Sequence, residues 1–349
     1  AYDEGIKDGQ FPVLWAGRVL WGVGSPVLML NYQLPYYIIQ GFHTVGLSLT
    51  DSYKLVLAIS FVGSGIAMYL VLRSRYTIMS SLIGATLYML APYRLVDVYV
   101  RGALGECVAF LFPPLLLLSF WKRSYLLAIA SFAGLFLSHP VGSAFFSGYF
   151  FFYGVIHDIK EKKINLVKFF GLSFLFALAI ASFNLVPTLA LTKYTQYSPE
   201  SSGTLSQFPT FTQLIYSPWG YGHSTDSPID QMSFQIGVIH WAVLIMAIPF
   251  LIYKKNASKN WEIIYNLSLS IVAIFLMLDI SSWFYVIIKL TKIIDFPWRI
   301  LMFLVFTTAL IGTELIAKIK IRKFAYILAI FIIGSLIYTN RNNRHINLI

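Results

Sequence analysis

Long apolar stretches separated by short polar connections occupy most of this sequence. Ten apolar runs can be marked, at residues 54–72, 76–91, 102–121, 125–138, 141–157, 167–190, 234–253, 261–279, 299–317 and 324–338. Several are shorter than the roughly 20 residues that a helix needs to cross a bilayer. With 58% hydrophobic and only 12% charged residues, a water-soluble protein would lack the polar residues to cover its surface. The pattern predicts an all-α polytopic membrane protein with about ten transmembrane helices, forming a single domain over residues 1–349.

The first 50 residues follow another pattern, in which tryptophan and tyrosine alternate with proline and glycine. Aromatic side chains of this kind concentrate at the depth of the lipid headgroups. We therefore predict that residues 1–50 form an interfacial loop with interfacial helices, from which a helix at about 28–46 enters the bilayer. Neither the opening Ala1-Tyr2 nor the polar stretch 339–349 is typical of a natural end, so we expect the sequence to be incomplete at both termini.

Basic residues concentrate at every second connection between the apolar runs. These connections are 73–75, 122–123, 160–163, 254–259 and 318–323. With Lys168, this side of the predicted membrane has 15 basic and four acidic residues, which accounts for the whole net charge of +11. Because cytoplasmic loops are enriched in lysine and arginine, we predict that this side is cytoplasmic in an integral plasma-membrane protein. The charge then reflects membrane topology, and no nucleic-acid partner is expected.

The opposite, extracytoplasmic side carries the remaining polar segments: residues 1–50, 92–106, 138–140, 191–233 and 280–299. The connection at 191–233 is long for a loop, and loops of this length are usually functional or disordered. Its seven aromatic residues favour an ordered outer cover. They are Tyr194, Tyr197, Phe208, Phe211, Tyr216, Trp219 and Tyr221.

The stretch 92–106 brings two arginines and two carboxylates together within fifteen residues, where one apolar run ends and another begins. Arg94, Asp97 and Arg101 are spaced three and four residues apart, so a helix would present them on one face. Glu106 follows within the first turns of the next apolar run. Charged groups near hydrocarbon are costly and usually mark a functional site. Two simpler explanations remain: a structural salt bridge between Asp97 and Arg101, and an Arg94 that only reaches lipid headgroups.

Other outer positions add candidates. His139 precedes a proline at a helix end, where it could equally be a structural histidine. Arg299 begins an apolar run, where a cation opposes the helix dipole, so capping does not explain it. His223 and Asp226 alone are weak indicators of a metal, and the single cysteine, Cys107, leaves no cysteine-based site. We therefore predict no metal site.

Several motifs resemble one membrane-protein family. They lie at residues 8–12, 22–26, 34–37, 91–106, 138–140 and 296–299. In them the sequence resembles the 6-pyruvoyl-tetrahydropterin-synthase-related membrane domain, over about residues 8–343. The resemblance implies membership of the glycosyltransferase C superfamily, integral membrane enzymes that use polyprenyl-phosphate-linked sugars on the outer face. Such enzymes usually place an essential aspartate in the first outer loop, a position that Asp3 or Glu4 would have to fill. An arginine expected before Trp15 is replaced by Leu14, and Arg18 follows one turn later.

Transfer from a lipid-phosphate sugar requires a carboxylate to take the acceptor proton and cations to stabilise the departing phosphate. The candidate catalytic residues are Glu106, Asp97, Asp3 and Glu4. The candidate substrate-binding residues are Arg94, Arg101, His139, Arg299 and Arg18. The resemblance also allows a divalent cation, since some superfamily members use one. The expected partners are a polyprenyl-phosphate sugar, membrane lipid and a membrane protein.

Two other classes of function stay open. A non-catalytic membrane subunit could keep the fold and scaffold a partner protein. A lipid or solute transporter is a third possibility, but transporters carry intramembrane charges near the midplane and corresponding halves, whereas these charges gather at one face. The sequence names neither the sugar nor the acceptor.

Overall fold

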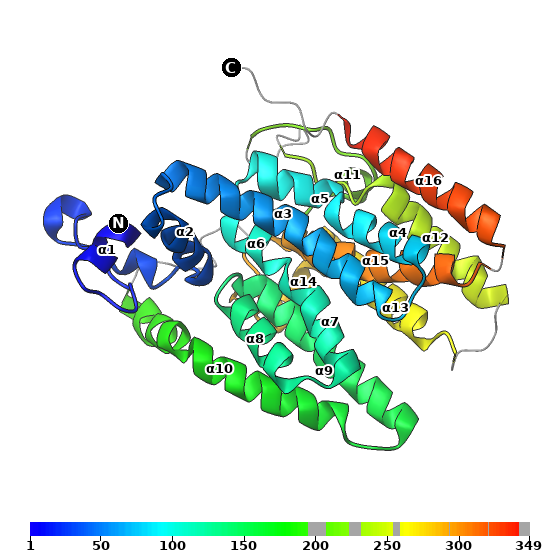
Figure 1. Ribbon diagram of the computed structural model, residues 1–349, viewed down its shortest axis with the longest axis horizontal. Coiled ribbons are helices and arrows are strands. Elements are labelled where there is room, and N and C mark those ends of the chain that lie inside the picture. The colour runs from blue at the N-terminus through cyan, green and yellow to red at the C-terminus, as the bar shows by residue number, and fades with distance from the viewer. Residues whose placement is uncertain (195–206, 223–231, 254–258, 293, 320, 342–349) are drawn as a thin grey trace. The chain divides into compact units, whose positions relative to one another are not determined.

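The computed structural model describes residues 1–194, 207–222, 232–253, 259–292, 294–319 and 321–341 (Figure 1). Over these residues the chain is helical, and its β-structure is limited to an isolated bridge between Ala16 and Ser25. The chain forms two compact units, which we describe separately. Unit 1 consists of residues 1–60 and 104–198, and unit 2 of residues 61–103 and 199–349.

Unit 1 contains a group of helices around α8. Its helices are α1 (Tyr2–Lys7), α2 (Leu34–Thr44), the first part of α3 (Leu49–Arg73), α6 (Leu104–Ala109), α7 (Phe112–Lys122), α8 (Tyr125–Phe136), α9 (Pro140–Glu161) and α10 (Leu166–Leu191), with short 3₁₀ turns η1 (Leu20–Gly22), η2 (Pro26–Leu28) and η4 (Thr192–Tyr194). Helix α8 packs against α7, α9 and α10. At its centre the buried Phe132 ring meets Phe170 and Phe174 nearly edge-on, with centroids 5.6 and 5.8 Å away, an arrangement that aromatic pairs favour.

Unit 2 is built around α15, most of whose side chains are buried. Its elements are the second part of α3, α4 (Ile78–Met89), α5 (Pro92–Leu95), the π-helical turn η3 (Val96–Val100), α11 (Phe211–Ile215), α12 (Val238–Tyr253), α13 (Trp261–Met277), η7 (Asp279–Ser281), α14 (Ser282–Ile287), η8 (Leu290–Lys292), η9 (Pro297–Ile300), α15 (Leu301–Ala317) and α16 (Arg322–Thr339). Helix α15 packs against α4, α12 and α13. Hydrogen bonds between buried side chains join it to its neighbours: Ser270 to Thr307 at 2.8 Å, and His240 to Thr308 at 2.7 Å.

All ten predicted apolar runs contain a helix, but not all of these helices have the length of a full span. Four helical segments are long and apolar enough to cross a membrane: Leu49–Arg73, Leu104–Lys122, Leu166–Tyr194 and Pro297–Ala317. A fifth results if Trp261–Met277 and Asp279–Ile287, bent by 91°, form one broken span. The described residues therefore contain four to five candidate spans, and the larger number of about ten stays a prediction.

Two predicted boundaries differ from the structure. The helix expected at about 28–46 begins only at Leu34, because Pro35 occupies its first turn, where a fixed φ and a missing N–H are best tolerated. The apolar run at 102–121 is divided into α6 and α7, because α7 restarts with Pro113 and Pro114 in its first turn. Proline inside a continuous helix would remove a backbone hydrogen bond and clash with the preceding turn.

Residues 207–222 of the long 191–233 connection pack onto helices of unit 2. The Phe208 ring meets Tyr285 of α14 with centroids 5.1 Å apart, and Phe211 meets Trp241 of α12 at 5.9 Å. Helix α11 begins with a capping box formed by Thr210 and Gln213. Tyr197, His223 and Asp226 lie outside the described residues.

Candidate functional site

The indole ring of Trp298 is the centre of a charged and aromatic cluster in unit 2. The guanidinium carbon of Arg101 lies 4.6 Å from its ring centroid, and that of Arg299 lies 5.8 Å away. Phe296 stacks on the same ring at 5.3 Å. The negative face of an aromatic ring attracts a cation, most strongly for tryptophan. The cluster therefore brings together two of the predicted substrate-binding arginines, Arg101 and Arg299, through Trp298, which lies in the motif at 296–299 but is not among the predicted site residues.

Each of these arginines also pairs with an aspartate four residues earlier in the chain. Arg101 Nη1 donates to Asp97 Oδ1 and, at 3.2 Å, to the hydroxyl of Tyr93. Arg299 Nη1 lies 2.7 and 2.6 Å from the two carboxylate oxygens of Asp295. The Asp97 side chain is fully buried, whereas the side chain of Arg101 keeps 14% of its surface exposed and that of Arg299 keeps 20%. Both arginine side chains thus remain partly exposed.

Local backbone structure places these side chains. Residues 96–100 form a π-helical turn, in which the Arg101 N–H donates to the Val96 carbonyl at 2.9 Å. Gly102 then ends the turn with φ 54°, a left-handed conformation that glycine adopts without strain. On the other side of the cluster, the 3₁₀ turn η9 starts at Pro297 and carries Trp298 and Arg299. Single-turn π-bulges frequently occur at functional sites.

Arg94, the third predicted arginine of this segment, occupies the interior of unit 2. Its side chain is fully buried. Nη2 donates to Ser64 Oγ at 3.3 Å, and the guanidinium carbon lies 5.5 Å from the Phe61 ring centroid. A side chain that only reached lipid headgroups would be exposed at its tip, so that alternative does not fit. Arg94 joins α5 to α3.

Unit 1 contains a second predicted group, in which Glu106 and His139 meet. Glu106 Oε2 lies 3.7 Å from His139 Nε2, and both side chains are almost completely buried. The Gly142 N–H donates to His139 Nδ1 at 3.0 Å and thereby caps α9. A neutral imidazole whose Nδ1 accepts a hydrogen bond carries its proton on Nε2. His139 therefore directs its N–H toward the carboxylate.

Gly105 allows the close packing beside this pair. A Cβ atom at Gly105 would collide with the carbonyl oxygen of Ser138 and lie 2.5 Å from the Tyr32 ring. The burial of the Tyr32 side chain raises its phenol pKa. Glu106 and His139 thus come from segments joined by backbone contact, and only a residue without a side chain fits at position 105.

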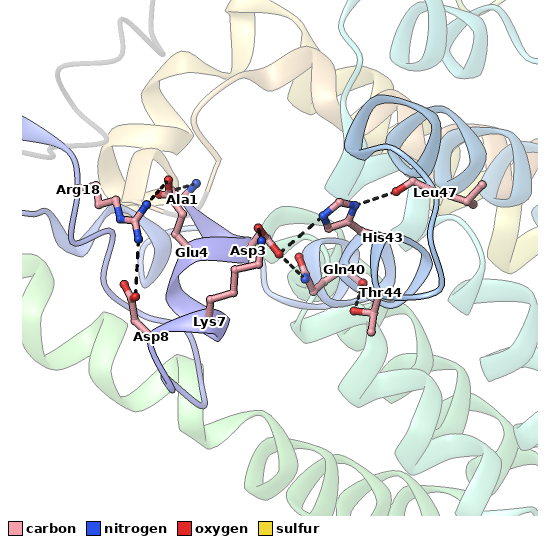
Figure 2. A network of polar contacts seen from close by, with 10 residues as sticks. All are labelled: Ala1, Asp3, Glu4, Lys7, Asp8, Arg18, Gln40, His43, Thr44 and Leu47. Atoms are coloured by element: carbon pink, nitrogen blue, oxygen red, sulfur yellow. Dashed lines mark hydrogen bonds and ion pairs between the residues drawn. The ribbon is translucent and has the colours of Figure 1, made fainter.

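Asp3, Glu4 and Arg18 belong to a separate network at the start of unit 1 (Figure 2). Asp3 accepts hydrogen bonds from Lys7 at 2.6 Å and from Gln40 at 2.9 Å. The Lys7 hydrogen bond and then that from Gln40 lower the pKa of Asp3. Glu4 pairs with Arg18 at 3.3 Å. Both acids are already paired with basic side chains, which is typical of groups that fix local structure.

A comparison with protein-family models identifies the family of this chain. The model of a membrane-protein family, the 6-pyruvoyl-tetrahydropterin synthase related domain, matches residues 30–343. The chain belongs to this family. No match was found among curated proteins or solved structures. The Trp298 cluster and the Glu106–His139 pair lie inside the matched part of this PTPS-related domain, whereas Asp3, Glu4 and Arg18 precede it.

Two members of the Trp298 cluster, Asp295 and Trp298, are not among the site residues predicted from the sequence of this PTPS-related domain. Asp295 stands four residues before Arg299, as Asp97 stands before Arg101, and this repeated spacing is a signal that could have found it. Trp298 lies in the motif at 296–299, but its contacts with the two arginines depend on tertiary packing, which the motif does not specify. Within the part of the chain that the structure describes, no three His, Cys, Asp or Glu side chains are grouped so that they could bind a metal ion.

Proposed function

We propose that this PTPS-related membrane domain transfers a sugar from a polyprenyl-phosphate donor to an acceptor on the extracytoplasmic face of the plasma membrane. The observation that carries the proposal is the Trp298 cluster. Two partly exposed arginines flank one aromatic ring in a protein otherwise rich in apolar helices. The guanidinium group can contact two phosphate oxygens at once, which makes arginine the preferred residue for phosphate recognition.

Arg299 is the better placed of the two arginines for an additional ligand. It contacts both oxygens of Asp295 through Nη1 alone. Its buried Nε has no hydrogen-bond partner among the described residues. A buried donor without an acceptor costs free energy, and a phosphate oxygen would provide the acceptor. Asp97 and Asp295 then act as positioning residues that hold the guanidinium groups against Trp298.

The Glu106–His139 pair supplies the acid–base chemistry. In the proposed step, the acceptor oxygen forms a bond to the anomeric carbon while the bond from that carbon to the phosphate oxygen breaks. The acceptor proton passes to the Glu106 carboxylate, and the electron pair leaves with the phosphate. Within unit 1, His139 Nε2 lies 3.7 Å from Glu106 Oε2 and positions the carboxylate. Within unit 2, Arg101 and Arg299 are the proposed binding residues for the negatively charged phosphate, and each role is tested by its own variants.

The proposal includes the finer topology predicted from the sequence. About ten spans, with the basic connections in the cytoplasm, place residues 92–106, 138–140 and 280–299 on the outer face. This arrangement, and membership of the glycosyltransferase C superfamily, suit a lipid-linked donor. The divalent cation that the resemblance allows has no ligand set among the described residues, and no step of the proposal uses one.

The test is transfer from a panel of radiolabelled polyprenyl-phosphate sugars by the protein in native membranes, compared with Glu106→Gln and Arg101→Ala. We expect both variants to lose transfer while they remain folded. Absence of transfer from every donor, or unchanged transfer in both variants, would refute the assignment. In that case the scaffold alternative becomes the better one, and purification with a stably bound membrane protein is its test.

A further inference from the structure

A cavity of about 230 Å³ opens in unit 2 beside the Trp298 cluster. It lies between the connection at 216–219, the segment 235–238 and the end of α16 at 338–341. Cavities that hold drug-sized ligands are larger, about 300–1,000 Å³. This volume suits a single ring-sized ligand.

Aromatic rings and polar side chains share the lining of this cavity. Tyr216, Trp219 and Tyr338 contribute rings. Buried Asn340 donates to the Leu90 and Leu336 carbonyls, both at 2.9 Å, which fixes its position. The guanidinium carbon of Arg341 lies 4.0 Å from the Tyr338 ring centroid. None of the described lining residues is acidic.

Trp219 brings a buried polar atom to this place. Its indole Nε1 is buried and has no hydrogen-bond acceptor among the described residues. Buried indole N–H groups usually find a partner. A hydroxyl oxygen of a ligand in the cavity would provide one.

Two neighbouring pairs of residues link the cavity to the Trp298 cluster. Phe234 meets the Trp298 ring at 5.9 Å, while the next residue, Gln235, lines the cavity. Pro92 lines the cavity, while the next residue, Tyr93, accepts the hydrogen bond from Arg101. Gly237 allows this compact arrangement, since a Cβ atom there would lie 2.9 Å from the Pro92 ring.

We propose that this cavity is a carbohydrate subsite that holds one sugar ring. The C–H face of a pyranose is slightly positive and packs on the negative face of an aromatic ring, for which Tyr216, Trp219 and Tyr338 are available. The hydroxyl groups require donors and acceptors, which Gln235 and the Trp219 indole provide. An apolar ligand would leave these polar groups unpaired, and a phosphate would leave the aromatic surface unused.

The subsite deepens the proposed function, since it gives the acceptor sugar a place next to the phosphate-binding arginines. Its role in transfer rests on the proposed function, whereas sugar binding to the cavity does not depend on it. The test is therefore binding without any donor: saturation-transfer NMR and calorimetric titration of the purified protein with a panel of methyl hexopyranosides, a methyl hexuronide and cyclohexanol.

We expect at least one pyranoside to bind, and cyclohexanol not to bind. Trp219→Leu should weaken binding about 3- to 10-fold through lost ring contact, and Gln235→Ala about fivefold through a lost hydrogen bond. Trp283→Leu is the matched control, because Trp283 is exposed on α14 and does not line the cavity. If the protein binds the hexuronide more tightly than the hexopyranosides, and Arg341→Gln abolishes this difference in affinity, the ligand of the subsite is an acidic sugar.

The subsite is refuted if no sugar binds, or if Trp219→Leu and Gln235→Ala both bind as well as wild type. Gln235 is only half buried, so its alanine variant tests the site even if the tryptophan variant fails to fold. If the wild-type protein binds a pyranoside but transfers no sugar from any donor, the subsite is supported and the transferase is contradicted separately.

Discussion

The guanidinium group of Arg101 lies over the face of Trp298, 4.6 Å from the ring centroid. The two residues are almost 200 positions apart in the sequence, and the contact joins the π-helical turn after α5 to the turn that begins α15. Together with Arg299 on the same ring, it gives unit 2 a pair of cations on an aromatic support.

Replacing Trp298 by phenylalanine keeps an aromatic ring but weakens the cation–π contacts. Such contacts contribute about 0.5–2 kcal/mol each, so the Trp298→Phe variant should bind the lipid-phosphate donor about 2- to 10-fold more weakly. Binding to the protein in lipid nanodiscs provides the measurement. Trp283→Phe, at an exposed position of α14, is the control. Equal donor affinities in the two variants would contradict a role for the ring.

His139 can be changed in two ways that separate its cap from its chemistry. Asparagine is a good N-cap residue, so His139→Asn should retain the stability of α9 but lose most of the transfer activity. His139→Ala should lose the activity and, in addition, about 1 kcal/mol of stability. Thermal unfolding and transfer are measured for both variants. An active His139→Asn protein would show that only the cap matters.

Glu106→Gln removes the proposed proton acceptor and keeps the size of the side chain. General acid–base catalysis contributes about 10²–10⁴-fold, and transfer should fall by this amount while donor binding stays close to wild type. In the double variant with His139→Asn, we expect little further loss, because residues that act as a unit are not additive. If the loss of transfer in the double variant equals the product of the two single losses, the two residues act independently.

Gly105→Ala tests the packing that holds Glu106. The new methyl group would collide with the Ser138 carbonyl and the Tyr32 ring, and overpacking of this kind costs about 1–3 kcal/mol. Gly148, inside α9, has open space around its Cβ position. Gly148→Ala should therefore be neutral or stabilise the helix by up to about 1 kcal/mol. If the two alanine variants unfold at the same temperature, the packing explanation is wrong.

Acid should weaken the network around Asp3. The pKa of this carboxyl is lowered in the folded protein by the hydrogen bonds from Lys7 and then Gln40, relative to its ordinary 3.8. The carboxylate therefore stabilises the fold above pH 3.8, and this contribution is lost as the pH falls below that value through the folded-state pKa. Thermal unfolding should show wild type more stable than Asp3→Asn at neutral pH. The difference should shrink on acidification, whereas a constant difference would contradict this assignment.

The sequence predicted the features that depend on local pattern. Apolar runs became helices, because hydrophobic stretches in this composition have few other ways to satisfy their backbone. The pairing of Asp97 with Arg101 followed from their four-residue spacing. Features that depend on tertiary packing were missed, namely Trp298 between two arginines and the burial of Arg94 against Ser64. The break between α6 and α7 was also missed, although Pro113 and Pro114 marked it.

The most direct measurement of the central claim compares the binding of polyprenyl phosphate with that of uncharged polyprenol. Wild type should prefer the phosphate, and Arg101→Gln and Arg299→Gln should each reduce that preference about 10- to 100-fold, as expected for hydrogen bonds to a charged group. Lys168→Gln, which removes an exposed cation of unit 1, should leave the preference intact. A preference for the phosphate that survives both arginine substitutions would contradict the assignment of the Trp298 cluster as the phosphate site.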